Sequence, residues 1–264
     1  MPEKTFQKTV PLFYFDNEGR TFEIAVRLKN TPGSLASLLA ALAREEVNVI
    51  NSTGYARDDY GVWVAFVQAS KENLNVQSLE TIALSSPSTL SVKVTHGVDG
   101  FLIDTLTFPL ARIDGDRDII IRAEFFRDMM AKLRREFHSA ADVFLYKEGM
   151  ALGERSTSYY LEKYGKDRIL SSLSYYQSIY SALGWARAEL VSADIEGRRA
   201  VLRLYESFEC PKEKGDKVYS HFLRGFINGS FSQLVGVETS AKEVMCQAKN
   251  DPYCEFVVGQ SNKI

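Results

Sequence analysis

The sequence TFEIAVRLKNTPGSL, at residues 21–35, sets the architecture of the N-terminal part of the chain. Its first eight residues alternate between apolar and polar, which is typical of a strand with one buried face. That face consists of Phe22, Ile24, Val26 and Leu28. A Pro-Gly turn ends the strand, and leucines follow it with the i, i+3, i+4, i+7 spacing of an amphipathic helix: Leu35, Leu38, Leu39 and Leu42. The stretch therefore predicts a strand, a tight turn and a helix that packs on a sheet.

The residues after this helix complete a recognisable order of elements. Segments 47–56 and 62–69 surround a turn and predict two antiparallel strands. A second helix follows, and residues 90–95 predict a closing strand. The order βαββαβ is that of the ferredoxin-like fold. We expect this domain over 21–97, preceded by an extension at 1–20 that contains a strand.

The Pro-Gly turn resembles that of the ACT domain, a family of regulatory domains. In that family the first strand ends at an acidic residue or Asn, followed by a Pro-Gly turn, a Leu and a helix. The resemblance implies a dimer interface at this loop and a small effector, commonly an amino acid, bound there. The alternative is a tight turn in a domain that dimerises without a ligand. The predicted effector-binding residues are Asn30, Thr31, Pro32, Gly33, Ser34 and Leu35.

The chain has 264 residues and a mass of 29.7 kDa, which is enough for two domains. Residues 98–118 contain Gly and Pro between short apolar runs and predict a connecting segment. We expect a second, mixed α/β domain over 119–264, with a helix at 123–137 and a later helix at about 218–234. The predicted fold class of the whole chain is therefore α+β.

The three cysteines all lie in the last quarter of the chain. Cys246 and Cys254 flank a turn almost symmetrically, so their thiols would face each other on adjacent strands, close enough to share one ion. Such spacing also permits a disulfide, and three unrelated buried thiols are a further alternative. With Cys210 and either Glu243 or His221, the set would suit a structural, tetrahedral zinc site.

Several motifs resemble the 4-vinyl-reductase domain, whose fold is shared with vesicle-tethering TRAPP subunits and which serves as a sensor of aromatic compounds in bacterial regulators. They are Gly184-Trp185, GFINGSF at 225–231, EVMC at 243–246 and NDPYCEF at 250–256. The resemblance implies zinc ligands at Cys210, Glu243, Cys246 and Cys254. The family's earlier Cys corresponds to Ser220 here, which leaves Cys210 or His221 as its substitute.

The resemblance also implies an apolar ligand pocket near the metal. Aromatic side chains suit such a pocket, although aromatics at helical spacing also fill ordinary cores. The predicted pocket residues are Tyr176, Tyr180, Trp185, Phe222 and Phe226.

Composition and missing motifs argue against several classes of function. The net charge of -2 and pI near 6.0 provide no basic field for nucleic acid, and no apolar run is long enough for a membrane span. The N-terminus has no apolar signal segment, which favours a cytoplasmic protein. No dinucleotide-binding turn, P-loop or G-x-S-x-G motif is present, so we expect a non-enzyme.

These observations predict a homodimeric regulatory protein that senses small molecules. Its output would pass through an unidentified protein partner, because no DNA-binding or ATPase module is evident. Two alternatives are a reductase or accessory enzyme of tetrapyrrole and vinyl-group metabolism, and a non-catalytic scaffold or tethering protein.

Overall fold

The computed structural model describes residues 6–15, 20–211, 215 and 217–260 of the chain. They form two compact units, one ending at Ile120 and the other beginning at Ile121. Each unit combines helices with an antiparallel sheet, which confirms the predicted α+β class.

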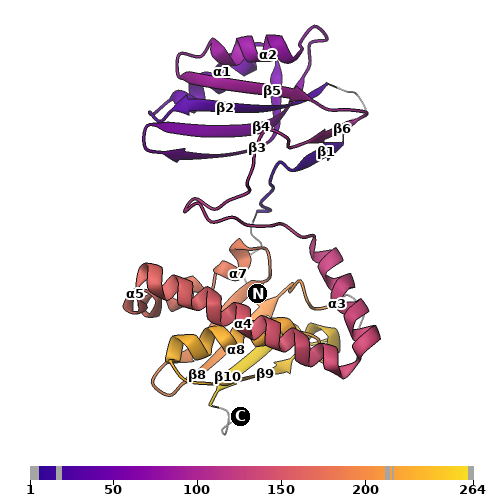
Figure 1. Cartoon of the computed structure of the whole chain (residues 1–264), viewed down its shortest axis with the longest axis vertical. Coiled ribbons are helices and arrows are strands. Elements are labelled where there is room, and N and C mark those ends of the chain that lie inside the picture. Colours follow the sequence, from indigo (N-terminus) through magenta and orange to yellow (C-terminus); the bar gives the residue numbers. More distant parts are fainter. Residues whose placement is uncertain (1–5, 16–19, 212–214, 216, 261–264) are drawn as a thin grey trace. The chain divides into compact units, whose positions relative to one another are not determined.

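The first unit contains the predicted βαββαβ order (Figure 1). Its four-stranded sheet has the order β3-β4-β2-β5, and the two helices pack on one face. The elements are β2 (Thr21–Lys29), α1 (Ser34–Arg44), β3 (Val47–Arg57), β4 (Tyr60–Ala69), α2 (Val76–Leu84) and β5 (Thr89–His96). The alternating residues predicted for the buried face of the first strand, from Phe22 to Leu28, lie in the core beneath these helices.

The second face of this sheet is partly covered. β1 (Phe13–Phe15) and β6 (Phe101–Ile103) form a two-stranded antiparallel ribbon on the side away from the helices (Figure 1). Phe66 of β4 faces this side and is 1% exposed. Residues 98–118, predicted to connect two domains, are thus part of the first unit. The stretches 1–5 and 16–19 of the N-terminal extension lie outside the described residues.

A buried carboxylate fastens this covering layer to the sheet. Glu23 of β2 is fully buried, and its Oε2 accepts a hydrogen bond from the backbone N–H of Thr105 at 2.9 Å. The Thr105 hydroxyl and the Leu106 N–H approach the same carboxylate at 3.3 and 3.4 Å. Burial, reinforced by the neighbouring Asp104, raises the pKa of Glu23 to about 7.

The second unit has a four-stranded antiparallel sheet of order β7-β8-β10-β9. Helix α8 packs on β9 and β10, and the long helix α4 packs on α8 (Figure 1). The strands are β7 (Arg187–Asp194), β8 (Arg199–Tyr205), β9 (Ser240–Met245) and β10 (Cys254–Gly259). The helices are α3 (Ala123–Phe137), α4 (Ser139–Tyr164), α5 (Lys166–Ser171), α6 (Leu173–Tyr176), α7 (Ile179–Ala182), α8 (His221–Val235) and the 3-10 helix η1 (Gln247–Lys249).

Glycines bring α4 and α8 into backbone contact. A Cβ atom on Gly149 would lie 2.0 Å from the Phe222 carbonyl oxygen, and one on Gly225 would lie 2.0 Å from that of Tyr146. Gly153 and Gly229 are equally close to the opposite helix. Because any side chain would force the two helices apart, only glycine suits these four positions.

Both helices whose bounds were predicted in this unit are present, and the structure corrects the start of the second. The helix predicted at 123–137 has those bounds, but α8 begins at His221 rather than at about 218. Among the described residues, no helix is long and apolar enough to cross a membrane.

We predict that Glu23 makes the stability of the first unit depend on pH. Since its folded-state pKa is above the ordinary value of 4.5, the folded state binds the extra proton between the two values. Stability is therefore greatest below pH 4.5 and falls as the pH rises through about 7. Glu23→Gln, a mimic of the protonated form, should match the wild type at about pH 4 and exceed it at pH 8 by up to about 3 kcal/mol.

Thermal denaturation across this pH range measures the difference. Glu72→Gln is the matched control, because the Glu72 side chain is 86% exposed in its ion pair with Arg20. Parallel pH profiles for Glu23→Gln and the wild type would refute the prediction.

Candidate functional site

The three cysteines converge in the second unit. Cys210 lies in the loop after β8, Cys246 directly follows β9, and Cys254 begins β10. All three thiols are free and buried, and their sulfur atoms lie within 4.8 Å of one another. The Sγ atoms of Cys210 and Cys246 are 4.0 Å apart.

The turn between β9 and β10 holds two of these cysteines in place. Asp251 Oδ2 accepts the Cys246 backbone N–H at 2.7 Å, and Asn250 adopts a left-handed conformation with φ 69°. The Gln247 N–H points at the Cys254 sulfur at 3.4 Å. The sequence therefore fixes this turn locally, and the pairing of β10 with both β8 and β9 brings Cys210 to the same sheet end.

The cluster favours a thiolate at its centre. Hydrogen bonding from Cys210 and Cys254 lowers the pKa of the Cys246 thiol. The same interactions raise the pKa of Cys254, and that of Cys210 rises to about 12. Three close sulfurs, of which one is readily deprotonated, make a donor set for a soft metal ion.

Glu243 lies next to this cluster but outside the group of close ligand atoms. Its oxygens accept hydrogen bonds from the backbone N–H and the hydroxyl of Ser220 at 3.1 and 2.9 Å. Burial and the neighbouring Cys246 raise the pKa of the Glu243 carboxyl to about 8. The Ser220 hydroxyl also lies 3.8 Å from the Cys254 sulfur, so Ser220 connects the carboxylate to one of the thiols.

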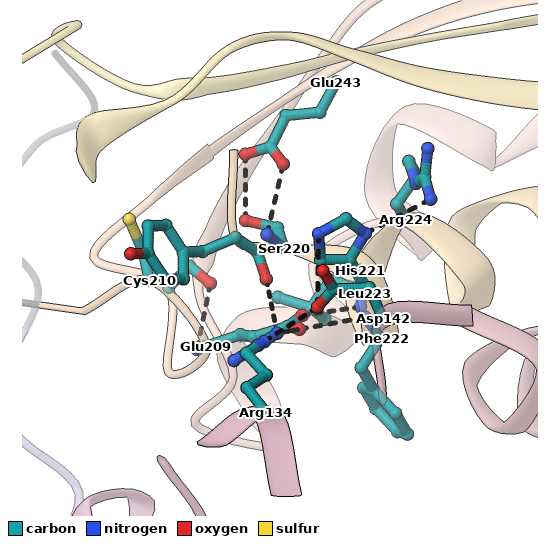
Figure 2. A network of polar contacts seen from close by, with 12 residues as sticks. Arg134, Asp142, Glu209, Cys210, Ser220, His221, Phe222, Leu223, Arg224 and Glu243 are labelled. Atoms are coloured by element: carbon teal, nitrogen blue, oxygen red, sulfur yellow. Dashed lines mark hydrogen bonds and ion pairs between the residues drawn. The ribbon is translucent and has the colours of Figure 1, made fainter. Parts of the chain in front are cut away.

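His221, the alternative fourth ligand, is directed elsewhere. Its Nε2 lies 3.5 Å from Asp142 on α4, and its Nδ1 lies 3.3 Å from Arg224 (Figure 2). The residue is the first of α8, and the helix turns its ring toward α4 rather than toward the sheet end. The structure therefore does not bring His221 to the cysteines.

Glu209, which the sequence analysis did not single out, organises the neighbourhood of the cluster (Figure 2). Its side chain is inaccessible to solvent, and it accepts the backbone N–H groups of Phe222 and Leu223 at 2.9 and 2.8 Å. Arg134 of α3 pairs with the same carboxylate at 3.2 Å. Glu209 therefore caps the positive end of α8 and ties it to α3 and to the Cys210 loop.

Desolvation of this carboxylate is only partly offset by its donors. Burial raises the pKa of Glu209 to about 7, although the two N–H groups and the Arg134 guanidinium oppose the shift. Arg134 is itself held by Asp142 at 3.0 Å and by the Tyr219 carbonyl at 2.8 Å.

Four of the five predicted pocket residues belong to one aromatic cluster. Trp185 stands at its centre, with ring centroids 5.0 Å from Phe226 and 6.2 Å from Phe222. Tyr180 contacts both Trp185 and Phe226. Phe126 and Phe208, which the prediction omitted, extend the cluster. The side chain of Tyr176 lies outside what the structure describes.

These rings pack edge to face against one another, and we call them the closed aromatic cluster because none of them lines either of the two pockets described next. A pocket with a volume of about 290 Å³ lies at the end of α4. Its walls are Tyr160, Tyr164, Ile169, Ser172, Tyr175, Ser178, Ile179 and Ala182. A larger groove of about 640 Å³ runs along α3 and is lined by charged residues, including Arg127, Arg134 and Arg135.

In the first unit, the predicted effector loop is an exposed turn. The Asn30 amide donates to the Asp58 carbonyl at 2.9 Å, which commits it to the β3–β4 turn. The hydroxyls of Thr31 and Ser34 hydrogen bond to each other at 2.8 Å.

The helix start in this loop has no side-chain cap. Gly33 is the N-cap of α1 with φ 87°, a left-handed conformation that favours glycine. Pro32 is exposed, and Leu35 is 41% exposed. The loop thus combines a helix start without a side-chain cap with an apolar side chain at the surface.

One comparison with known proteins finds a family similarity near the end of the chain. The sequence model of the 4-vinyl-reductase domain family matches residues 200–260, a span that contains all three cysteines and Glu243. No curated protein shows significant sequence similarity to the chain.

Solved structures show distant likeness. The phenol-responsive sensory domain of the transcription activator PoxR, crystallised with phenol, is similar with a TM-score of 0.46 and 14% identity over 58% of this chain and 85% of that one. A vinyl-4-reductase family protein from Methanocaldococcus jannaschii gives 0.32 and 14%, over 53% and 98%. The ACT domain of GTP pyrophosphokinase from Chlorobium tepidum gives 0.25 and 9%, over 28% and 96%.

We predict that Glu209 is required for the first turn of α8. Glu209→Ala removes the acceptor of two backbone N–H groups and a partner of the largely buried Arg134, which should destabilise this region by about 3 kcal/mol. Hydrogen exchange at Phe222 and Leu223 should accelerate accordingly.

Glu206→Ala is the control, because Glu206 lies in the same loop and also pairs with an arginine, but its side chain is 69% exposed. Its effect should stay below about 1 kcal/mol. Equal exchange rates in the two variants would contradict the role assigned to Glu209.

Proposed function

We propose that the chain is a non-enzymatic, cytoplasmic regulatory protein that senses small molecules. Its second unit would bind an apolar or aromatic ligand beside a structural zinc site. Its first unit would act as an ACT domain that binds a small polar effector and pairs with a second copy of the chain. The observation that carries the proposal is the convergence of all three cysteines within the segment that matches the 4-vinyl-reductase domain family.

The sulfur geometry supports a zinc site. Thiolates around a tetrahedral zinc ion at about 2.3 Å lie about 3.8 Å from one another. The Cys210 and Cys246 sulfurs are 4.0 Å apart, and all three sulfurs fall within 4.8 Å. Zinc would supply structural cross-linking of the strand ends, with Cys210, Cys246 and Cys254 as ligands. Glu243 would complete the set if its carboxylate turned from Ser220.

The aromatic cluster supports an apolar ligand. Tyr180, Trp185 and Phe226 present ring faces and edges of the kind that line sites for small organic molecules. Phe222 and Phe226 lie on α8, whose first turn is fixed by Glu209 next to Cys210. The proposed ligand site therefore includes residues of α8, and Ser220, just before this helix, lies 3.8 Å from the Cys254 sulfur.

The uncapped start of α1 supports an effector in the first unit. Backbone N–H groups at a helix N-terminus suit a carboxylate, and Gly33 leaves space for its approach, since a Cβ atom there would meet nothing within 4 Å. The amide of Asn30, in contrast, is used within the fold. A second copy of the chain would complete the site around the exposed Leu35.

We predict that Cys254→Ser abolishes zinc binding and loosens the β9–β10 hairpin. The wild type should carry about one zinc per chain, because metal binding at such a site is coupled to local folding. Elemental analysis of protein made without an affinity tag gives the stoichiometry, and hydrogen exchange locates the loosening. The sheet of the first unit should be unaffected.

Val244→Ser is a suitable control, because Val244 lies on the same hairpin but is 43% exposed. A wild-type protein without zinc, with three titratable thiols in the folded state, would mean that the cysteines are packing residues.

We predict that a small carboxylate stabilises the wild type through the Gly33 loop. Thermal shift with a panel of amino acids at millimolar concentration should find at least one stabilising compound. Gly33→Asn should abolish this shift, because asparagine tolerates a left-handed conformation but its side chain occupies the space of the effector.

Gly115→Asn, at another glycine of positive φ in the first unit, serves as the control. A wild-type melting temperature that no amino acid changes would favour a domain that dimerises without an effector.

A further inference from the structure

Gln177 carries a buried acceptor without a partner. Its Oε1 is inaccessible to solvent and has no hydrogen-bond partner among the residues that the structure describes. Leaving a buried carbonyl oxygen unpaired costs free energy, so such an atom calls for an explanation. One explanation is a donor that arrives with a ligand.

The position of Gln177 points to the aromatic cluster. It ends α6 in a right-handed helical conformation, and the Tyr180 backbone N–H donates to the Gln177 carbonyl at 3.2 Å. Residues three apart on a helical turn share a face, so Gln177 shares the face of Tyr180. Tyr180 is buried against Trp185 and Phe226.

The opposite face of residues 175–182 lines a pocket. Tyr175, Ser178, Ile179 and Ala182 form one wall of the 290 Å³ pocket at the end of α4. Ile179 also packs against the hydrophobic core that contains Tyr180 and Phe226. The segment 173–182 therefore separates an open pocket from the closed aromatic cluster.

The segment 173–182 has features that favour its displacement by a ligand. It consists of two helices of four residues each, α6 and α7, and neither has a side-chain cap. Such short helices have little stability of their own and depend on the packing of their buried face. A molecule that occupies the pocket could replace that packing by its own contacts.

We propose that Gln177 is the specificity-determining residue of the ligand site. The ligand is a small aromatic ring that bears a hydrogen-bond donor, such as a hydroxyl or amino group. It enters from the pocket as α6 and α7 move, and its donor pairs with Gln177 Oε1. A hydrocarbon of the same shape leaves this oxygen unpaired and binds more weakly. The inference rests on the proposed binding of an apolar or aromatic ligand by this unit.

The test compares three probes on the full-length protein by titration calorimetry: phenol, toluene and anisole. Phenol donates a hydrogen bond, anisole only accepts one, and toluene does neither. The wild type should bind phenol at least about tenfold more tightly than the other two. Gln177→Met keeps the length of the side chain but removes its acceptor, so the preference for phenol should collapse while toluene affinity is retained.

A second measurement distinguishes the loss of a ligand contact from misfolding of the variant. The melting temperature of ligand-free Gln177→Met should be equal to or higher than that of the wild type, because the variant buries no unpaired oxygen. Gln77→Met, the same change at an exposed position of α2, should alter neither the melting temperature nor the order of affinities.

The outcomes separate this inference from the function on which it rests. Binding of all three probes with equal affinity, a preference for anisole, or a phenol preference that survives in Gln177→Met would overturn the role of Gln177 and leave aromatic binding intact. Failure of the wild type to bind any probe would overturn the aromatic ligand, and the inference with it.

Discussion

The buried carboxylate of Glu209 is the interaction on which the second unit depends most. It joins the first turn of α8 to Arg134 of α3, and it lies next to Cys210 in sequence. Ser220, just before α8, binds Glu243, and Glu243 neighbours Cys246. Figure 2 shows two sets of polar contacts at the start of α8, one between Arg134, Glu209 and the helix and the other between Ser220 and Glu243. Because a buried charge is costly without partners, this arrangement permits few alternatives for the start of α8.

The glycine contacts between α4 and α8 supply a second constraint. With the backbones of the two helices almost touching at Gly149 and Gly225, α8 cannot move away from the sheet without taking α4 along. Phe222 and Phe226 lie on this same helix and contact Trp185. In the proposed sensor, a ligand that displaced these rings would act on α8, which follows directly after Ser220 and its contacts with Glu243 and Cys254.

Local patterns could be predicted from the sequence, whereas long-range contacts could not. The predicted alternation around Ile24 is present in the fold. The closeness of Cys246 and Cys254 could also be predicted, because the register of a hairpin is set by its local turn. Helix α4 was not predicted as one element, because a glycine inside a helix usually weakens it. The structure shows that Gly149 is needed for the close contact of α4 with α8.

The sequence gives no sign of the role of Glu209, since a lone acidic residue in a loop does not reveal the helix end that it caps. His221 was a plausible ligand by residue type, yet its ring is directed to α4, and only the tertiary structure determines that direction.

The packing of the aromatic cluster determines which elements a bound ligand would have to move. A ligand that fits an existing cavity leaves the protein nearly unchanged, whereas one that must separate Tyr180 from Phe226 has to move the elements that carry them. Helices α6 and α7 are single turns without side-chain caps, whereas α8 is bound by Glu209 and contacts α4 at four glycines. This difference assigns motion to α6 and α7, and rigidity to α8. In the proposed sensor, a change in the surface formed by α6 and α7 would therefore be the first consequence of binding that a protein partner could detect.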